Sequence, residues 1–264
     1  MKQQAGWGMW QRVKGLLALL RSHHEDVPPH LRKPVIRRRG RTTELQFARG
    51  VGQSRMLAAE PDRLLIDYTR TMMGALLLVP RPSRIGMVGL GGGSQAKFCY
   101  RHLPEADVEV MENNPHVIAL RKRFRVPDDD ARFRIVPGDA ARLLQERCGR
   151  YDLLLVDGYD ETGIPEALST QRFYDDCRDS LATNGALAIN LYCKDPQPHI
   201  EKLRRSFGKT RVAVVEEIRQ SNRVAFAWVG TPAVDEVPAL SPAGCVELAA
   251  EFVRLRGLGR RSRG

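Results

Sequence analysis

The sequence predicts an α/β protein with a doubly wound, mostly parallel sheet of seven strands, preceded by a small β appendage. From residue 83 onward, short apolar runs alternate with helical patterns, which is typical of a parallel sheet covered on both faces. A glycine-rich segment follows the first run, and acidic residues follow the next three. Because 42% of the 264 residues are hydrophobic, one large core can form. The pattern is that of a Rossmann-like sheet.

Residues 1–41 read as a basic tail that contains an amphipathic helix. Residues 7–20 are largely apolar, but Arg12 and Lys14 interrupt them, so the apolar run is too short to span a membrane. No small-residue cleavage site follows, which disfavours a secretory signal. We expect this helix to dock on the protein itself, with a partner or a membrane surface as alternatives.

Residues 42–80 predict a small β segment followed by a helix. Three short runs have the composition of strands, at residues 43–47, 53–57 and 63–66. Gly50, Gly52 and a turn at residues 60–62 separate them. Residues 69–78 have the length and composition of a helix, which ends before a Pro-Arg-Pro sequence.

Residues 81–232 predict the Rossmann-like catalytic domain. Its expected parallel strands are residues 84–88, 107–111, 132–136, 151–156 and 186–191. The expected helices are residues 94–102, 115–124, 140–146, 170–181 and 198–207. Residues 211–215 and 224–229 follow one another without a helix, so they should pair as a hairpin at one edge. Residues 233–264 predict a closing helix at 241–255 and a second basic tail.

The formal net charge of +11 is concentrated in the two tails. Residues 1–41 hold ten Lys and Arg residues against two acids, and residues 253–264 hold five Arg residues and no acid. The segment between them is slightly acidic, which disfavours a nucleic-acid-binding body. The tails are either solubilising ends or non-specific contacts to nucleic acid or an anionic surface.

Cysteine and histidine usage indicates a protein without structural metals. The five cysteines are odd in number, widely spaced and form no CxxC pair, so neither a disulfide framework nor a zinc site is expected. The six histidines show no metal-binding spacing either. We therefore expect a reducing, cytoplasmic setting and no transmembrane segment.

The glycine-rich segment after the first strand predicts a cofactor-binding loop. It contains Gly89, Gly91, Gly92 and Gly93, and Ser94 opens the next helix. Glycines permit positive φ and close backbone approach, while a helix start presents unpaired N–H groups. No Gly-Lys-Ser/Thr sequence follows, so a nucleoside triphosphate is not expected. A relaxed dinucleotide pattern, GxGxxA, is present at residues 91–96, and it is a weak signal alone.

Acidic residues at the ends of the second and third strands suit an adenosine group. Glu112, nineteen positions after Gly93, is placed to accept hydrogen bonds from both hydroxyls of a ribose. Its alternative is an acid favoured by the dipole of the following helix. Asp139 is placed to accept from an adenine amino group, with the Ala140 amide beside it, or else to cap the next helix.

Asp157 and Asp160 follow the fourth strand and point to the reaction. Two carboxylates at a reaction centre suit a cationic substrate and the deprotonation of an amine better than they suit hydride transfer. The alternative for Asp157 is a structural cap of the loop that follows it.

Together these features resemble the spermidine synthase family, the polyamine aminopropyltransferases, which share the fold of class I AdoMet-dependent methyltransferases. The resemblance runs over residues 52–230 and rests on Gln53, Tyr68, the glycine loop, Glu112, residues 138–140, residues 151–160, Phe173 and Tyr174. It implies a transferase of polyamine biosynthesis that acts on a small-molecule amine. Family members often dimerise, so we expect a homodimer.

The resemblance also implies roles for individual residues. The glycine loop, Glu112 and Asp139 would hold the adenosine of decarboxylated AdoMet, and Gln53, Ser94 and Ala140 belong to the same cofactor-binding set. Asp157 would orient and deprotonate the attacking amine, and Tyr68 and Asp160 would help to place it. Residues 158–168 would form the loop that closes over the site.

Two departures from the family pattern bear on the substrate. The family usually has an Asp directly after its glycines, which pairs with the ammonium of the aminopropyl group, and here that position is Ser94. The family also has Tyr-His-Glu where this chain has Tyr68, Thr69 and Arg70, so a cation replaces a carboxylate. If Arg70 faces the pocket, it will oppose a polycation.

Three hypotheses follow from the sequence. The leading one is a spermidine synthase-like transferase that moves an aminopropyl group from decarboxylated AdoMet to an amine. The first alternative is an AdoMet-dependent methyltransferase on the same fold, favoured by Ser94. The second alternative is a non-catalytic adenosine-binding or interaction protein whose basic tails carry the function.

Overall fold

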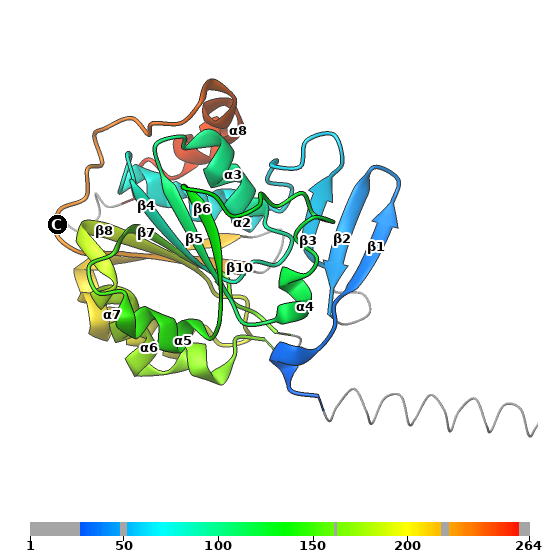
Figure 1. The fold of residues 1–264 in the computed structure, drawn as a ribbon. Helices are drawn as coiled ribbons and strands as arrows, with labels where there is room; N and C mark the ends of the chain where they lie inside the picture. Colours follow the sequence, from blue (N-terminus) through cyan, green and yellow to red (C-terminus); the bar gives the residue numbers. More distant parts are fainter. Residues whose placement is uncertain (1–26, 48–51, 161–162, 218–221, 259–264) are drawn as a thin grey trace, which may run out of the picture.

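A seven-stranded sheet forms the centre of the molecule (Figure 1). The structure is a computed structural model that describes residues 27–47, 52–160, 163–217 and 222–258. The strand order is β6-β5-β4-β7-β8-β10-β9, with bounds β4 (Arg84–Val88), β5 (Asp107–Glu112), β6 (Phe133–Pro137), β7 (Tyr151–Val156), β8 (Leu181–Asn190), β9 (Val212–Glu217) and β10 (Asn222–Trp228). The first five strands in this order, β6 to β8, are parallel, whereas β10 pairs antiparallel with both β8 and β9. The predicted doubly wound sheet, with its antiparallel hairpin at one edge, is confirmed.

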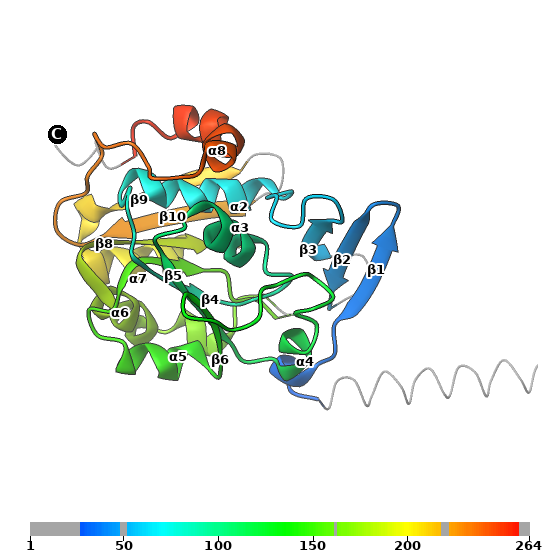
Figure 2. The ribbon, with the colours of Figure 1, turned by 45° about the horizontal axis from the view of Figure 1, so that its top comes forward.

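Helices cover both faces of this sheet (Figures 1 and 2). One face carries α2 (Asp67–Met72), α3 (Ser94–His102) and α8 (Pro242–Arg254). The other face carries α5 (Ala140–Leu143), α6 (Gln171–Asp179) and α7 (Gln197–Phe207), while α4 (Pro115–Ile118) is a single turn near the small sheet. Short 3-10 turns complete the chain: η1 (Pro29–Leu31), η2 (Met73–Leu77), η3 (Leu144–Glu146), η4 (Glu166–Ser169) and η5 (Lys209–Arg211).

The alternation of side chains along the strands builds a separate core on each face. On β7, Leu153 and Leu155 pack with the layer of α2, α3 and α8, whereas Leu154 and Val156 pack with the layer of α5, α6 and α7. All four side chains are buried. Because both faces are covered, residues 153–156 of β7 form an uninterrupted apolar run, which is why the sequence identified this strand.

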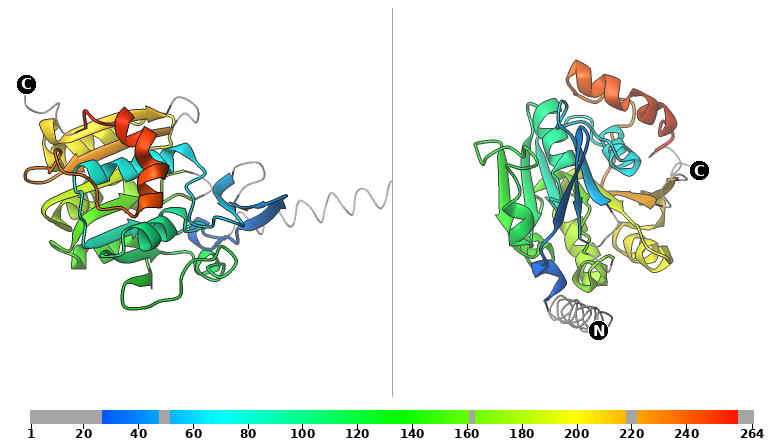
Figure 3. Two further views of the ribbon diagram at one scale, coloured as in Figure 1. Left: turned by 90° about the horizontal axis from the view of Figure 1, so that it is seen from above. Right: turned by 90° about the vertical axis from the view of Figure 1, so that its right-hand side faces the viewer.

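A small antiparallel sheet stands at one end of the molecule, beyond the main sheet (Figure 3). Its strands are β1 (Val35–Arg39), β2 (Thr42–Gln46) and β3 (Gly52–Leu57), in that order. The predicted small β appendage is therefore present, but it begins inside the segment expected to be a basic tail. Ile36 on β1 pairs with Leu45 on β2 in a hairpin and packs against the core, and this pairing outweighs the polar composition of the strand. Of the predicted tail, residues 1–26, where an amphipathic helix was expected, lie outside the described residues, as do residues 259–264.

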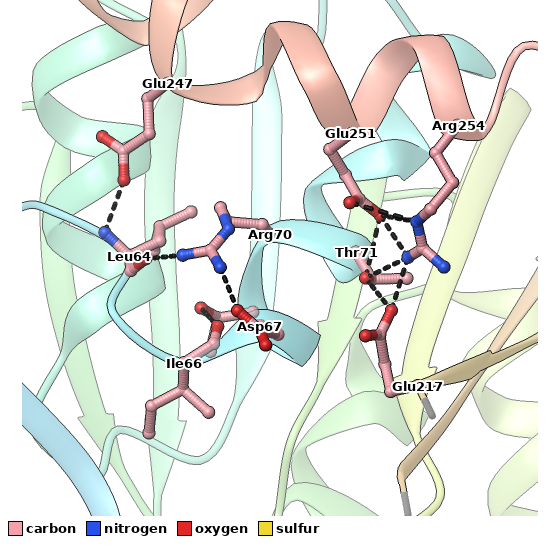
Figure 4. Close-up of polar contacts among 10 residues, drawn as sticks. Leu64, Ile66, Asp67, Arg70, Thr71, Glu217, Glu247, Glu251 and Arg254 are labelled. Atoms are coloured by element: carbon pink, nitrogen blue, oxygen red, sulfur yellow. Dashed lines mark hydrogen bonds and ion pairs between the residues drawn. The ribbon is translucent and has the colours of Figure 1, made fainter. Parts of the chain in front are cut away.

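The strand predicted at residues 63–66 is wrong. Within this segment, the backbone N–H of Leu64 donates to the Glu247 carboxylate of α8 at 2.6 Å, and its carbonyl accepts from Arg70 (Figure 4). Side chains therefore satisfy the backbone groups that a neighbouring strand would otherwise pair with.

The closing helix α8 is joined to α2 and to β9 by a polar cluster (Figure 4). Arg254 forms ion pairs with Glu217 of β9 and Glu251 of α8, and it also donates to the Thr71 hydroxyl. Thr71 on α2 is fully buried and contacts both carboxylates. This cluster holds together three elements that are distant in the sequence.

Several predicted helices are shorter in the structure. The helix expected at residues 115–124 ends at Ile118 and continues as turns, and the one expected at 140–146 divides into α5 and η3. The helix expected at 69–78 likewise begins at Asp67 and becomes the 3-10 turn η2. Within the described part of the chain, each helix is too short or too polar to cross a lipid bilayer.

Candidate active site

A pocket of about 1230 Å³ at the carboxyl ends of the parallel strands is the candidate active site. It lies where the strand order reverses between β4 and β7, the position at which open α/β sheets bind ligands. The loops after β4 to β8 and part of the small sheet form its walls. The predicted site residues that line it are Tyr68, Gly89, Gly91, Ser94, Glu112, Asp139, Ala140, Asp157 and Asp160.

The glycine loop after β4 has the backbone that its sequence predicts. Gly89 adopts a φ of +90°, and a Cβ atom there would lie 2.4 Å from the Asp157 carbonyl oxygen. A side chain at this position would therefore push the loop away from β7. Gly92 and Gly93 belong to the same loop, but both are buried and do not line the pocket.

Glu112, at the end of β5, connects the glycine loop to the next turn. One carboxylate oxygen accepts from the Leu90 amide and the other from the Asn114 amide, each at 2.8 Å. Burial raises the pKa of Glu112, and these backbone hydrogen bonds counteract that rise. The Gly91 and Asn113 amides also stabilise the charged form of this carboxylate, which holds the loop in place and lines the pocket.

Asp139, at the end of β6, is the N-cap of α5. Its Oδ1 atom accepts from the Ala141 amide at 2.9 Å, as the structural alternative predicts. The same residue also lines the pocket beside Ala140. The cap and a contact to a ligand are thus compatible, because the carboxylate has two oxygens.

Asp157, at the end of β7, is held by two neighbours within the pocket. The Tyr68 hydroxyl donates to Oδ2 at 2.9 Å, and the Asn190 side-chain amide donates to Oδ1 at 2.9 Å. Asn190 in turn accepts from the Asn222 side chain at 3.0 Å. Burial raises the pKa of Asp157, and both hydrogen bonds to its charged form oppose that rise. The pKa of Tyr68 is well above its ordinary range because of burial and the adjacent carboxylate, so the phenol stays a donor.

The segment after Asp157 forms the outer wall of the pocket. The Tyr159 hydroxyl donates to the Asn190 carbonyl at 2.7 Å and accepts from the Tyr192 amide at 2.6 Å, which joins the ends of β7 and β8. Asp160 lines the pocket, and its backbone bridges to Gly163. Residues 161 and 162 lie outside the described part of the chain. Closure of residues 158–168 over the site stays a prediction.

The structure turns Arg70 away from the pocket. Its guanidinium forms an ion pair with Asp67 and donates to the Leu64 carbonyl (Figure 4). Thr69, its neighbour, does line the pocket, and its hydroxyl donates to the Ile66 carbonyl at 2.6 Å. Arg70 therefore does not face the pocket, and we do not expect it to oppose a polycation there.

The sequence did not predict some of the residues that form the site. Asn190 ends β8, so the rule that strand ends carry ligand-binding residues would have found it. Asn222 and Ser54, which approach from β10 and from the small sheet, gave no comparable signal. The backbone of Gln53 lies in β3, and its side chain is outside what the structure describes.

The chain is similar to curated polyamine aminopropyltransferases. It is 36% identical to the polyamine aminopropyltransferase of Chromobacterium violaceum over 191 residues, which cover 71% of this chain and 73% of that protein. A probable spermidine synthase from Corynebacterium glutamicum matches with a TM-score of 0.64 at 18% identity, over 74% of this chain and 76% of that one. Human methyltransferase-like protein 13, solved in complex with SAH, matches with a TM-score of 0.58 at 20% identity, over 72% and 92% of the two chains. No family model matches the sequence. The two solved structures share the fold of this chain.

Proposed function

This chain belongs to the polyamine aminopropyltransferase family, and on that premise we propose that it transfers an aminopropyl group from decarboxylated AdoMet to an amine. As a member of that family it is a transferase. The observation that carries the proposal is the Asp157 carboxylate, which Tyr68 and Asn190 hold within the pocket. A buried carboxylate with a raised pKa is suited to take a proton from an attacking amine.

The residues at the other end of the pocket fit an adenosyl donor. Glu112 lines this end of the pocket, where its carboxylate is placed to accept from the hydroxyls of a ribose. Asp139 uses Oδ1 for its cap, which leaves Oδ2 as an acceptor for an adenine amino group. When bound, the donor supplies a carbon next to a sulfonium, and the departing thioether needs no help from the protein.

The chain's own residues align the amine and keep it neutral for attack. Asp157 accepts the proton, while Tyr68 and Asn190 fix the direction of its two oxygens. Asp160 adds a second acidic residue to the lining of the pocket, which favours a cationic substrate over a neutral one. Tyr159 and Leu168 add apolar surface to the lining of the pocket.

Asp157→Asn tests the proposal. We expect the turnover of amines to fall by at least about 100-fold, because the amide cannot accept the proton. Binding of decarboxylated AdoMet, measured by calorimetry, should change by only a few-fold. Asp128→Asn, at an exposed carboxylate outside the pocket, is the matched control and should leave both measurements unchanged. Full turnover by Asp157→Asn would remove Asp157 from the mechanism.

An AdoMet-dependent methyltransferase is the second candidate function. Ser94 favours it, because a hydroxyl does not select for the aminopropyl ammonium as a carboxylate would. The two functions differ in the group added to the acceptor, so the product mass distinguishes them. A methylated amine formed from AdoMet would support this candidate.

We further propose that the enzyme is a cytoplasmic homodimer. All five cysteines are free thiols in the structure, which is compatible with a reducing compartment. Cross-linking and light scattering would measure the dimer.

A further inference from the structure

We infer that the outer side of the small sheet docks on an anionic lipid bilayer, together with the apolar segment at residues 7–20. The surface is formed by β1 and the turn that follows it, and we call its arginines the basic hairpin: Arg37, Arg38, Arg39 and Arg41. None of these four residues lines the pocket. When the molecule is viewed from this end, β1 and β2 stand in front of the main sheet (Figure 3).

The basic hairpin has no acid that compensates its charge. Residues 27–47 and 52–57 hold seven Lys and Arg residues, and Glu44 is their only acid. The Glu44 carboxylate is buried and forms an ion pair with Arg55 at 3.0 Å, so its charge is already used. Within the described part of the chain, none of the four arginines forms an ion pair. All of them except Arg37, which is half-buried, are exposed to solvent.

Charges on an edge strand also serve to prevent its pairing with a second sheet. β1 is such an edge strand, because it lies at the end of the order β1-β2-β3 and pairs with β2 alone among the described strands. This role accounts for arginines on β1. It does not account for exposed apolar side chains beside them.

Two apolar side chains lie exposed directly before the arginines. Leu31 in η1 is 41% exposed and Val35 at the start of β1 is 52% exposed. Because side chains alternate along a strand, Val35 shares one face of β1 with Arg37 and Arg39. A bilayer surface offers acyl chains to the apolar groups and phosphates to the guanidinium groups. Apolar and basic side chains on one outer surface are typical of proteins that lie on a membrane.

The sequence that precedes the described residues continues this pattern. Residues 7–20 predict an amphipathic helix with two tryptophans near its start and basic residues within it. The described chain begins at Val27, so six residues separate this segment from it. Tryptophan is favoured at the boundary between lipid and water. Binding of such segments increases with the apolar area that they bury and with attraction to anionic lipids, and the basic hairpin adds to the second of these.

A nucleic acid is the other polyanion that unpaired arginines attract. Proteins that bind single strands add exposed aromatic rings, on which the bases stack. Phe47 is the one Phe, Tyr or Trp among residues 27–47 and 52–57, and it packs against the core. A duplex, held through its phosphates, would leave Leu31 and Val35 without a partner. The exposed aliphatic side chains therefore favour a bilayer.

Co-sedimentation of the full chain with lipid vesicles tests the inference. We expect binding to vesicles of phosphatidylglycerol and phosphatidylcholine in equal parts. Binding to pure phosphatidylcholine should be at least about 10-fold weaker, since each basic residue near an anionic surface strengthens binding about five-fold. High salt should weaken the binding to anionic vesicles, because it screens the charges. Equal binding to both kinds of vesicle, or binding to neither, overturns the inference.

Arg39→Gln combined with Arg41→Gln tests the basic hairpin. Neither side chain forms an ion pair or a hydrogen bond among the described residues, so the fold should be retained, as circular dichroism and thermal unfolding will verify. We expect binding to anionic vesicles to weaken by about 10- to 30-fold.

Arg204→Gln combined with Arg211→Gln is the matched control. It removes the same net charge from exposed positions at the end of α7 and in η5, at the opposite end of the molecule from the small sheet (Figure 1). Binding to anionic vesicles should stay within about two-fold of the wild type. Equal losses in the two double variants would show an effect of net charge alone and overturn the inference.

Trp7→Ser combined with Trp10→Ser tests the apolar segment. We expect binding to anionic vesicles to weaken by at least about 10-fold, because two large apolar side chains no longer enter the lipid. Unchanged binding would overturn the part given to residues 7–20. Fluorescence anisotropy with single-stranded RNA and with duplex DNA is measured in parallel. If the Arg39 and Arg41 exchange abolishes nucleic-acid binding and leaves vesicle binding intact, the surface belongs to a nucleic acid and the inference is overturned.

Discussion

At the scale of single residues, two opposing effects set the pKa of Asp157. Burial raises its pKa and makes it a stronger base, while hydrogen bonds from Tyr68 and Asn190 stabilise its charged form. Without those donors the carboxyl group would stay protonated over a wider pH range. Asn190 is thus a positioning residue that acts through Asp157.

Asn190→Leu should shift the acid limb of the pH–rate profile to higher pH. The variant removes a donor to the charged carboxylate, so the pKa of Asp157 rises further and the basic form appears only at higher pH. A charge-assisted hydrogen bond of about 1.5–3 kcal/mol corresponds to a shift of roughly one to two pH units. The measurement is kcat/KM for the amine as a function of pH.

Tyr68→Phe removes the donor to the other oxygen and should shift the same limb in the same direction. A purely structural role for either side chain would lower activity equally at every pH. Profiles that keep the wild-type limb in both variants would contradict the role given to this pair.

Lys97 is a buried cation that lies close to the site but does not line it. Its side chain is 4% exposed, and Nζ donates to the Phe124 carbonyl at 2.8 Å. Burial is the main cause that lowers the pKa of Lys97, to about 7. The unfolded chain therefore binds more protons than the folded one between pH 7 and the ordinary lysine range.

Stability should accordingly rise as the pH increases from 7 to 9. Lys97 can raise the free energy of unfolding by at most about 1.4 kcal/mol per pH unit. Lys97→Met keeps a side chain of similar length without the charge, so it should remove this part of the slope. Urea denaturation of both proteins at pH 7 and pH 9 gives the comparison. Identical slopes would show that Lys97 stays protonated throughout.

At the scale of elements, the closing helix α8 depends on polar groups as well as on Leu248. Glu217 and Glu251 both contact the Thr71 hydroxyl, whose single proton can serve only one of them. The guanidinium of Arg254 compensates both carboxylates. This arrangement makes Arg254 the group on which the attachment of α8 depends.

Arg254→Met should lower the free energy of unfolding by about 1–3 kcal/mol, because it leaves two poorly exposed carboxylates without a cation. Chemical denaturation measures the change. Arg205→Met is the matched control, since Arg205 pairs with Glu201 on the surface and should contribute less than about 1 kcal/mol. Equal effects of the two variants would contradict the role of the cluster.

At the scale of the whole molecule, most of the fold could be predicted from the sequence because its signals are local. Apolar runs such as Leu153 to Val156 identify strands that are buried on both faces, and the glycines after β4 identify a required turn. β1 was missed because its stability comes from pairing with β2, which the Arg-rich sequence of residues 35–39 does not show. The direction of Arg70 was equally out of reach, since it depends on the Leu64 carbonyl in a segment that the sequence misassigned.

The candidate site was predictable to a similar extent. Strand-end residues such as Glu112 and Asp157 follow from the rule for open α/β sheets. The donors to Asp157 come from α2 and β8, and Asn222 supports them from β10, so only the folded chain brings them together.

The most direct test of the central proposal is the mass of the product formed by the purified chain from decarboxylated AdoMet and a panel of amines. We predict an acceptor that gains one aminopropyl group, together with methylthioadenosine, and loss of both products in Asp157→Asn. If an active donor preparation yields no aminopropyl product with any amine of the panel, the proposed reaction is contradicted.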